Sequence, residues 1–286
     1  MRKFLTIIIY TVVILLVGRN LSFLPRFTVL SDPSTLARDI KTETEKTIKS
    51  KKGNYGIYFA DLSSGKAFGI SEKEMFTAAS VNKVPIVATF YYLENKGKMD
   101  FDKQITLQKR DIQDYGTGSL RYQKTGSTYS LKTLAKLALK QSDNTAAHIL
   151  GEYIGRDVIQ AYMDDLGLRQ TNIEENTTSP YDMYLLFKKI YENKVTTKGK
   201  TQELLEFMTE TDIEDRIPAQ LPESAMTYHK TGDAVGSLHD VGIIVYENKP
   251  YFLGVMTSDI GNQETVTRET ISEIAKNIIE YRNARR

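Results

Sequence analysis

The order of hydrophobic patterns along the chain is the feature that most constrains its fold. Period-two alternation, typical of half-buried strands, occurs at 55–60 and 67–70 and returns at 226–230, 241–246 and 251–257. Between these runs, from 79 to 211, apolar residues recur at helical spacing. Turn sequences at 63–66 and 247–250 join neighbouring strands as hairpins, which requires antiparallel pairing. We therefore predict an α/β fold: a mainly antiparallel five-stranded sheet, flanked by helices and interrupted by an all-helical subdomain at about 75–215.

Helix signals complete this outline. Asp32 followed by Pro33 is a typical helix start, with an N-cap and a proline at the first helical position. The helix that begins there runs to about 51, and a terminal helix covers 264–281. These two helices lie outside the insertion and are available to cover the sheet. Inside the insertion the pattern predicts helices at 80–97, 131–140, 144–153, 156–165, 180–191 and 201–208.

Charge and composition exclude several classes of function. The chain has 38 basic and 36 acidic residues, and four of the basic ones precede the first acid, so no basic field remains for nucleic acid. It has no cysteine, which excludes disulfides, thiolate zinc sites and cysteine nucleophiles. The sequence shows no metal-ligand spacing and no phosphate-binding glycine loop. We expect neither a metal nor a cofactor.

The N-terminus has the pattern of a targeting segment. A short basic start precedes an uncharged run from Phe4 to Gly18, which continues past Arg19 to Leu24. That length is close to the roughly 20 residues that span a bilayer, and no small-x-small cleavage pattern follows. We predict an uncleaved signal-anchor at 1–24, a linker at 25–31 and a folded, exported part at 32–286. The alternative is a cleaved signal and a secreted protein.

The first motif that carries chemistry is Ser80-Val81-Asn82-Lys83. Residues at i and i+3 share one face of a helix, so the Lys83 amine would lie beside the Ser80 hydroxyl. A serine becomes a nucleophile when a neighbouring base takes its proton. By itself this spacing is weak evidence, since it should occur about once by chance in a chain of this length.

Two further motifs raise the significance of the first. Ser142-Asp143-Asn144 falls at a junction of two helices, where these residue types are also ordinary caps. Lys230-Thr231-Gly232 precedes Asp233 at a strand end, where a simple turn is the alternative. A helix start, a helix junction and a strand edge can converge on one cleft, and the three motifs together are far rarer than each alone.

With these motifs the sequence resembles the penicillin-recognising serine enzymes, specifically the class A β-lactamase branch. Further stretches at 115–120, 144–147 and 176–183 also resemble that family, and the resemblance extends from about 33 to 279. It implies a helical subdomain packed on an α/β subdomain, with the active site between them. The serine hydrolase expected from it would occupy 32–286.

The resemblance also implies roles for individual residues. Ser80 would be the acylated nucleophile, Lys83 its base, and Ser142 the relay that protonates the departing nitrogen. Lys230 and Thr231 would bind the substrate carboxylate and keep the cleft positive. Asn144 would hold the side-chain amide of the substrate, and the backbone N–H of Asp233 would contribute to the oxyanion hole. Thr231 and Gly232 belong to the substrate-binding strand motif, and Tyr115 would form a wall of the cleft. Arg216 would be a further ligand of the substrate carboxylate. The alternative for Arg216 is a surface arginine paired with Glu214 or Asp215.

One element of the class A pattern is missing. Those enzymes carry a glutamate in a long Ω loop that activates the deacylating water, whereas the stretch 166–177 is short and lacks Glu-x-x-Leu-Asn. Glu174 and Glu175 are the acids available there, and we interpret them as solvated surface residues. The short loop resembles that of related D,D-peptidases.

The sequence therefore predicts an exported serine acyl-transfer hydrolase that is acylated by β-lactams or by D-Ala-D-Ala stem peptides. We favour a D,D-peptidase-like cell-wall enzyme with slow β-lactam hydrolysis, acting as a monomer and held at the membrane by its N-terminal segment. The alternatives are a genuine β-lactamase that confers resistance, a β-lactam or peptidoglycan sensor that is acylated once, and a wall-binding domain with an inactive site.

Overall fold

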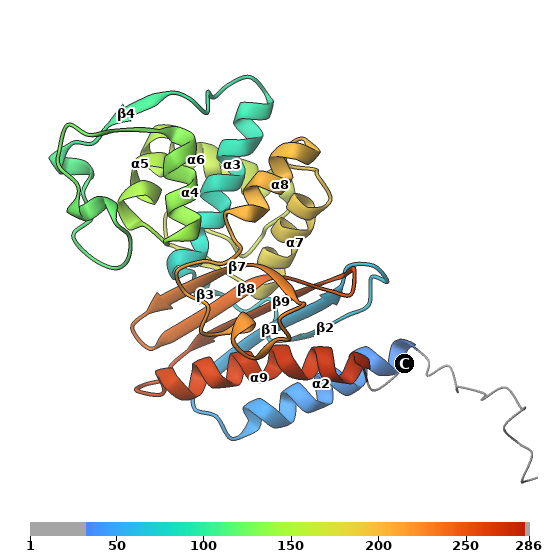
Figure 1. Cartoon of the computed structure of the whole chain (residues 1–286). Helices are drawn as coiled ribbons and strands as arrows, with labels where there is room; N and C mark the ends of the chain where they lie inside the picture. The colour runs from blue at the N-terminus through green and yellow to red at the C-terminus, as the bar shows by residue number, and fades with distance from the viewer. Residues whose placement is uncertain (1–32, 284–286) are drawn as a thin grey trace, which may run out of the picture.

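The computed structural model describes residues 33–283. Two helices, α2 and α9, lie together on one face of a five-stranded sheet, and the remaining helices lie on its other side (Figure 1). The helices are α2 (Pro33–Lys49), α3 (Lys83–Asn95), α4 (Leu131–Lys140), α5 (Asn144–Ile154), α6 (Arg156–Leu166), α7 (Pro180–Tyr191), α8 (Lys198–Glu206) and α9 (Glu264–Asn283).

The sheet confirms the predicted antiparallel pairing. Its strands are β1 (Asn54–Asp61), β2 (Ala67–Ile70), β7 (Met226–Ala234), β8 (Ser237–Tyr246) and β9 (Lys249–Ser258), in the order β2-β1-β9-β8-β7. Every neighbouring pair is antiparallel, and β1 from the start of the chain pairs with β9 along its whole length. This pairing joins the strands that precede the inserted segment to those that follow it in one sheet. Strand β7 forms the edge next to the insertion.

Alternation along the strands divides the molecule into two hydrophobic cores. One core lies between the sheet and helices α2 and α9. It contains Ile57 and Phe59 of β1, Leu253 of β9 and Ile274 of α9. Neighbouring positions such as Phe252 point to the opposite face and join the core of the inserted helices. A one-residue slip in register would exchange these two sets, so the hydrophobic pattern fixes the pairing.

The inserted segment is mainly helical, and it also contains short strands that the helical pattern does not predict. These strands form two small two-stranded sheets, one from β3 (Phe76–Thr77) and β6 (Thr177–Thr178), the other from β4 (Gln104–Thr106) and β5 (Thr128–Ser130). The 3₁₀ turns that accompany them are η2 (Ala79–Asn82), η3 (Lys109–Asp111), η4 (Leu120–Tyr122) and η5 (Ile217–Gln220).

Several predicted boundaries differ from those observed. The predicted helix at 80 begins as the 3₁₀ turn η2, and the α-helix starts only at Lys83. The last helix of the insertion begins at Lys198 rather than 201, with Gly199 inside its first turn. Strand β7 continues through Lys230-Thr231-Gly232 to Ala234, because β8 pairs with it as far as Ser237. The strand-end turn proposed as an alternative for that motif is therefore wrong.

The predicted signal-anchor, the linker and the cap at Asp32 lie outside the described residues. Within 33–283, no helix combines the length and the hydrophobicity needed to cross a membrane. The division of the chain at 24 and 31 stays a prediction.

Candidate active site

A cleft lies where the inserted helices meet the edge strand β7. Its volume is about 350 Å³, and its walls come from six separate parts of the sequence. The first motif contributes Ser80 from η2 and Lys83 from the start of α3. The junction of α4 and α5 contributes Ser142 and Asn144, and strand β7 contributes Thr231 and Asp233. A further wall is formed by Tyr115, Gly116 and Thr117. The three motifs thus converge on one cavity, which we call the catalytic cleft.

Ser80 and Lys83 form the centre of this cleft. The Lys83 Nζ lies 3.0 Å from the Ser80 Oγ and donates to the Asn144 Oδ1 at 2.7 Å. It also donates to the backbone oxygen of Ser142. These contacts hold the amine against the hydroxyl, which is the geometry of a base and its nucleophile.

The Ser142 hydroxyl lies between two lysines. Its Oγ is 3.1 Å from the Lys83 Nζ and accepts a hydrogen bond from the Lys230 Nζ at 3.0 Å. Asp143 caps α5 by accepting from Ala146, so the same tripeptide starts the helix and presents Ser142. The capping role of this tripeptide is therefore compatible with the functional role that the resemblance implies for Ser142.

Burial favours the neutral form of both Lys83 and Lys230. Desolvation, reinforced by the charge of Lys230, lowers the pKa of Lys83 to about 6, against a partial opposing effect of Asp143. Desolvation also lowers the pKa of Lys230 to about 7, although Asp240 opposes it. At neutral pH a neutral Lys83 can accept the Ser80 proton.

The backbone around the cleft is strained. Ala79, Ser142 and Asn176 have φ values of 49°, 53° and 52°, in the left-handed region that non-glycine residues rarely adopt. All three line the catalytic cleft. Such strain is typical of functional sites, where the surrounding structure holds it in place.

Glycine is needed at position 232 because the backbone of β7 lies very close to the segment that carries Ser80, not because the chain turns there. A Cβ at this position would lie 3.0 Å from both the Ala78 oxygen and a Val81 methyl carbon. The absence of a side chain lets β7 lie directly against the turn that carries Ser80. We infer that this role in packing accompanies the substrate-binding role implied by the resemblance.

Asn144 and Tyr115 line the outer part of the cleft. The Asn144 amide donates from Nδ2 to the backbone oxygen of Tyr115 at 3.0 Å, while its Oδ1 accepts from Lys83. The Tyr115 residue is 65% exposed, so its ring is accessible to a ligand. Gly116 lies beneath the Asn144 amide, where a Cβ would overlap the Nδ2 at 2.4 Å.

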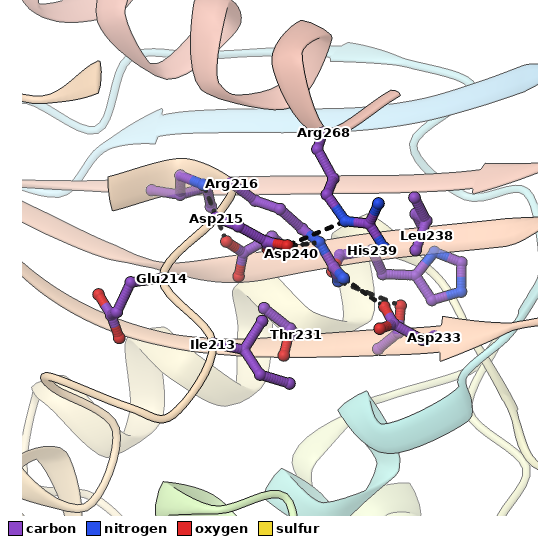
Figure 2. Close-up of polar contacts among 12 residues, drawn as sticks. Ile213, Glu214, Asp215, Arg216, Thr231, Asp233, Leu238, His239, Asp240 and Arg268 are labelled. Atoms are coloured by element: carbon purple, nitrogen blue, oxygen red, sulfur yellow. Dashed lines mark hydrogen bonds and ion pairs between the residues drawn. The ribbon is translucent and has the colours of Figure 1, made fainter. Parts of the chain in front are cut away.

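Arg216 differs most from expectation. Its side chain is fully buried, so the alternative of a surface arginine is wrong, and it is not among the described residues that line the cleft. Its Nη2 lies 2.5 Å from the Asp233 carboxylate and its Nη1 donates to the His239 oxygen at 2.7 Å (Figure 2). Arg216 lies behind Asp233 and can act on the cleft through it, and its expected role as a ligand of the substrate carboxylate stays a prediction.

A chain of charges extends behind Arg216. Asp215 lies 3.3 Å from the Arg216 Nε and 2.9 Å from the Arg268 Nε of α9 (Figure 2). Asp233, at the front of this chain, is half-exposed and lines the cleft. An acidic side chain here would repel an anionic substrate unless a cation balances it, and Arg216 is placed to do so.

Two buried histidines, His229 and His239, lie behind the cleft, and the sequence pattern predicts a role for neither. Burial disfavours a charged His229, but its contacts with Asp240 at 2.8 Å and Glu214 at 3.0 Å outweigh this and raise its pKa to about 9. Burial lowers the pKa of His239 to about 4, and its neutral ring joins Thr77 to β9. Their burial and fixed partners make both structural. Within 33–283 no group of three or more His, Asp and Glu side chains is arranged to hold a metal ion.

The segment that takes the place of the class A Ω loop forms a tight hairpin, in agreement with its short sequence. Asn172 and Thr177 exchange two backbone hydrogen bonds of 2.9 and 3.0 Å. Glu174 and Glu175 lie at its exposed tip, and Glu174 pairs with Arg156 at 2.9 Å. Asn176, the first residue of the family-like stretch 176–183, also lines the cleft, although no role was predicted for it. Its place just before the Thr-Thr-Ser-Pro stretch is the signal that could have identified it.

Comparison with known proteins agrees with this geometry. A family described as "Beta-lactamase enzyme family" matches residues 35–282. β-Lactamase VEB-1 of Pseudomonas aeruginosa is 22% identical over 83% of this chain and 88% of its own length. β-Lactamase SME-1 of Serratia marcescens is 26% identical over 78% of this chain and 82% of its own length.

Solved structures give the same result. PBP-A is 25% identical, with a TM-score of 0.80 over 86% of this chain and 96% of its own. A point mutant of PBP-A, solved as an acyl-enzyme complex with penicillin G, is 26% identical, with a TM-score of 0.80 over 88% and 97% of the two chains. With the family matched over most of its length and the motifs gathered in one cleft, this chain belongs to the β-lactamase enzyme family and is a serine hydrolase with the α/β fold of class A β-lactamases.

Proposed function

We propose that this chain is a D,D-peptidase-like cell-wall enzyme that β-lactams also acylate at Ser80 and that hydrolyses them slowly. The observation that carries the proposal is the tight hairpin at 172–177, which leaves the cleft without an Ω-loop carboxylate. Of the described residues that line the cleft, Asp233 alone bears a carboxylate, and Arg216 pairs with it. The similarity to PBP-A, whose mutant was solved acylated by penicillin G, supports the same choice.

Acylation would use the groups already in contact. Neutral Lys83 takes the proton of Ser80 while the Oγ attacks the carbonyl carbon of the substrate. Backbone N–H groups of Ser80 and Asp233 would stabilise the oxyanion. The Ser142 hydroxyl then gives its proton to the leaving nitrogen and regains one from Lys83, because it lies 3.1 Å from that amine. Lys230 and Thr231 would bind the substrate carboxylate.

Deacylation requires a different proton transfer. A water molecule must attack the ester while a base takes its proton, and such a base typically supplies 10²–10⁴-fold. A peptide's leaving group departs and opens the cleft to water or to an acceptor amine. The leaving nitrogen of a β-lactam stays tethered and obstructs that approach. We therefore expect β-lactam adducts to accumulate while D-Ala-D-Ala peptides turn over.

A genuine β-lactamase is the second candidate. The relatives VEB-1 and SME-1 carry that name, and Glu174 lines a pocket that adjoins the cleft. In this case Glu174 would exchange its pairing with Arg156 for a water on the acyl ester. β-Lactam turnover would then be steady from the start.

Intact mass and product release together test the proposal. With a chromogenic penicillin we expect a burst of one equivalent, an adduct on Ser80 and slow turnover, with Ser80→Ala giving no adduct. A D-Ala-D-Ala peptide or thioester analogue should turn over continuously. Turnover of tens per second without a burst, together with an acyl-enzyme trapped by Glu174→Gln or Glu175→Gln, would support the β-lactamase instead.

A further inference from the structure

The β7 wall of the catalytic cleft presents a carboxylate to a bound substrate. Thr231 and Asp233 lie two positions apart in β7, so their side chains project from the same face of the strand, and both residues line the cleft. The Asp233 side chain is 48% exposed, whereas that of Arg216 is fully buried behind it. This wall would receive the terminal group of the leaving residue, so that group meets the acid and not the arginine.

The two arginines behind Asp233 balance its charge, but this row of four residues carries no surplus positive charge. Arg216 lies 2.5 Å from Asp233 and 3.3 Å from Asp215, and Arg268 lies 2.9 Å from the other oxygen of Asp215 (Figure 2). Two guanidinium groups therefore face two carboxylates. Neither arginine is among the described residues that line the cleft, so their N–H groups are not presented to a ligand there.

Lys230 adds only part of a positive charge to this wall at neutral pH. Its side chain is buried, and its Nζ donates to the Ser142 Oγ at 3.0 Å and to the Thr231 backbone oxygen at 2.9 Å. Desolvation lowers the pKa of Lys230 to about 7, so the amine is about half protonated at that pH. The attraction of the β7 wall for an anion is therefore weak, and the pattern of hydrogen-bond donors and acceptors decides what binds there.

That pattern distinguishes a terminal carboxylate from a primary carboxamide. As a carboxylate, Asp233 only accepts hydrogen bonds, whereas the Thr231 hydroxyl can donate one. A terminal carboxylate on the substrate offers acceptors alone and carries the same sign of charge as Asp233. A primary carboxamide offers an oxygen that accepts from Thr231 and an NH₂ group that donates to Asp233. The carboxamide therefore satisfies both side chains, and the carboxylate satisfies one.

We propose that Asp233 selects a leaving residue whose terminal carboxyl group is amidated, so that the enzyme cleaves peptides ending in D-Ala-D-alaninamide in preference to those ending in D-Ala-D-Ala. The inference rests on the proposed function and specifies its leaving group. The chemical step is unchanged: the peptide C–N bond breaks as the Ser80 ester forms, and the nitrogen of D-alaninamide takes the proton that Ser142 gives.

Two matched pairs of acyl donors test this preference on the full chain. Nα,Nε-diacetyl-L-Lys-D-Ala-D-Ala and its C-terminal carboxamide give kcat/KM from the release of D-alanine or D-alaninamide. Benzylpenicillin and its primary carboxamide give the rate constant of Ser80 acylation by intact mass, and they serve even if neither peptide is turned over. For each pair, the selectivity is the value for the amide divided by the value for the carboxylate.

Asp233→Asn should lower this selectivity about tenfold in both pairs, because asparagine has no charge and can donate to a carboxylate. The intrinsic reactivity of each donor is the same for both proteins and cancels in the comparison. The matched control is Asp114→Asn. Asp114 is exposed and lies between Gln113 and Tyr115, which line the cavities, but it is not among the described lining residues itself. The control should keep the wild-type selectivity.

A second measurement remains available if Asp233→Asn does not fold. The selectivity of the wild type for the two penicillins is divided by that of hydroxide in the uncatalysed reaction, and the quotient should be about ten. Equal selectivity in the wild type and in Asp233→Asn, or a quotient of one or less, would overturn the leaving-group preference alone. A wild type that forms no adduct with either penicillin and cleaves neither peptide would overturn the proposed function itself.

Discussion

At the scale of single residues, the proposed mechanism assigns opposite charge states to two lysines. In that mechanism Lys83 is neutral, so that it takes the Ser80 proton, and Lys230 is charged, so that it binds a carboxylate. Their pKa values, about 6 and about 7, lie close together because both amines are buried beside the Ser142 hydroxyl. Since the lysines interact, the observed values belong to the pair.

We therefore predict a bell-shaped pH profile for acylation by penicillins. The rate constant should rise with pH as Lys83 loses its proton near pH 6 and fall as Lys230 loses its proton near pH 7. Stopped-flow acylation from pH 4.5 to 9.5 measures it. Lys230→Arg should remove the alkaline limb, because arginine keeps its charge throughout this range. A flat profile would show that neither lysine titrates here.

Arg216 yields a second prediction at this scale. Arg216→Ala leaves the Asp233 carboxylate without its cation and should slow acylation by anionic β-lactams about tenfold. If Arg216 acts through Asp233, Asp233→Asn should restore most of the lost rate in the double variant. Acylation rates of the wild type, both single variants and the double variant form the test, with thermal unfolding to check folding. Additive effects would mean that Arg216 acts independently of Asp233.

At the scale of elements, His229 joins three pieces of the structure. It lies in β7, contacts Asp240 of β8 and reaches Glu214 in the segment that also carries Arg216. Asp240 accepts from the Ile217 amide at 3.0 Å and so binds the same segment. These contacts place the Arg216 segment against the edge of the sheet.

The raised pKa of His229 predicts how this support depends on pH. A folded-state pKa of about 9, above the ordinary 6.5, gives a stabilisation that is complete below pH 6.5 and is lost as pH rises through 9. The free energy of unfolding of the wild type should exceed that of His229→Gln by an amount that shrinks by about 3 kcal/mol across this window. The comparison of wild type with His229→Gln is needed because the two buried lysines, whose pKa values are lowered, make stability rise with pH over the same range. Subtracting the variant's free energy of unfolding removes that opposite effect.

Urea unfolding of both proteins at pH 6, 7.5 and 9 gives these differences. A difference that stays constant over that range would show that His229 does not bind an extra proton in the folded state.

At the scale of the whole molecule, both halves of the fold contribute residues to the candidate active site. The α/β part supplies Lys230 and Asp233, whereas the inserted part supplies Ser80, Lys83 and Ser142. The N-terminal segment precedes α2, which lies with α9 on the face of the sheet away from the inserted helices (Figure 1). A tether joined there would leave the cleft accessible.

We predict that residues 4–24 retain the protein in the membrane with the catalytic part outside. A chain expressed with its own N-terminus should fractionate with membranes, and intact mass should show residues 1–24 still attached. Deletion of residues 1–31 should give a soluble protein with the same acylation rate. A mature N-terminus near residue 25 or later would instead show a cleaved signal and a secreted enzyme.

Local patterns predicted much of this architecture. Alternation at 55–60 and 251–257 identified strands, hairpin turns required antiparallel pairing, and helical spacing located the helices of the insertion. The nucleophile motif and its two partner motifs were also recognisable, because each is a short run of residues. Boundaries such as the start of α8 were predicted less well, since Gly199 discourages a helix locally while tertiary packing retains it.

Local sequence patterns therefore predict the order and type of the elements and the candidate reacting residues, because these depend on neighbours along the chain. The direction in which Arg216 points, the charge on His229 and the second pocket beside the cleft follow from tertiary contacts alone. Burial, ion pairing and cavities arise between segments far apart in sequence: Arg216 and Asp233 form an ion pair although 17 positions separate them, and Asn144 and Asn176, 32 positions apart, line the same cavities. No local pattern contains that information.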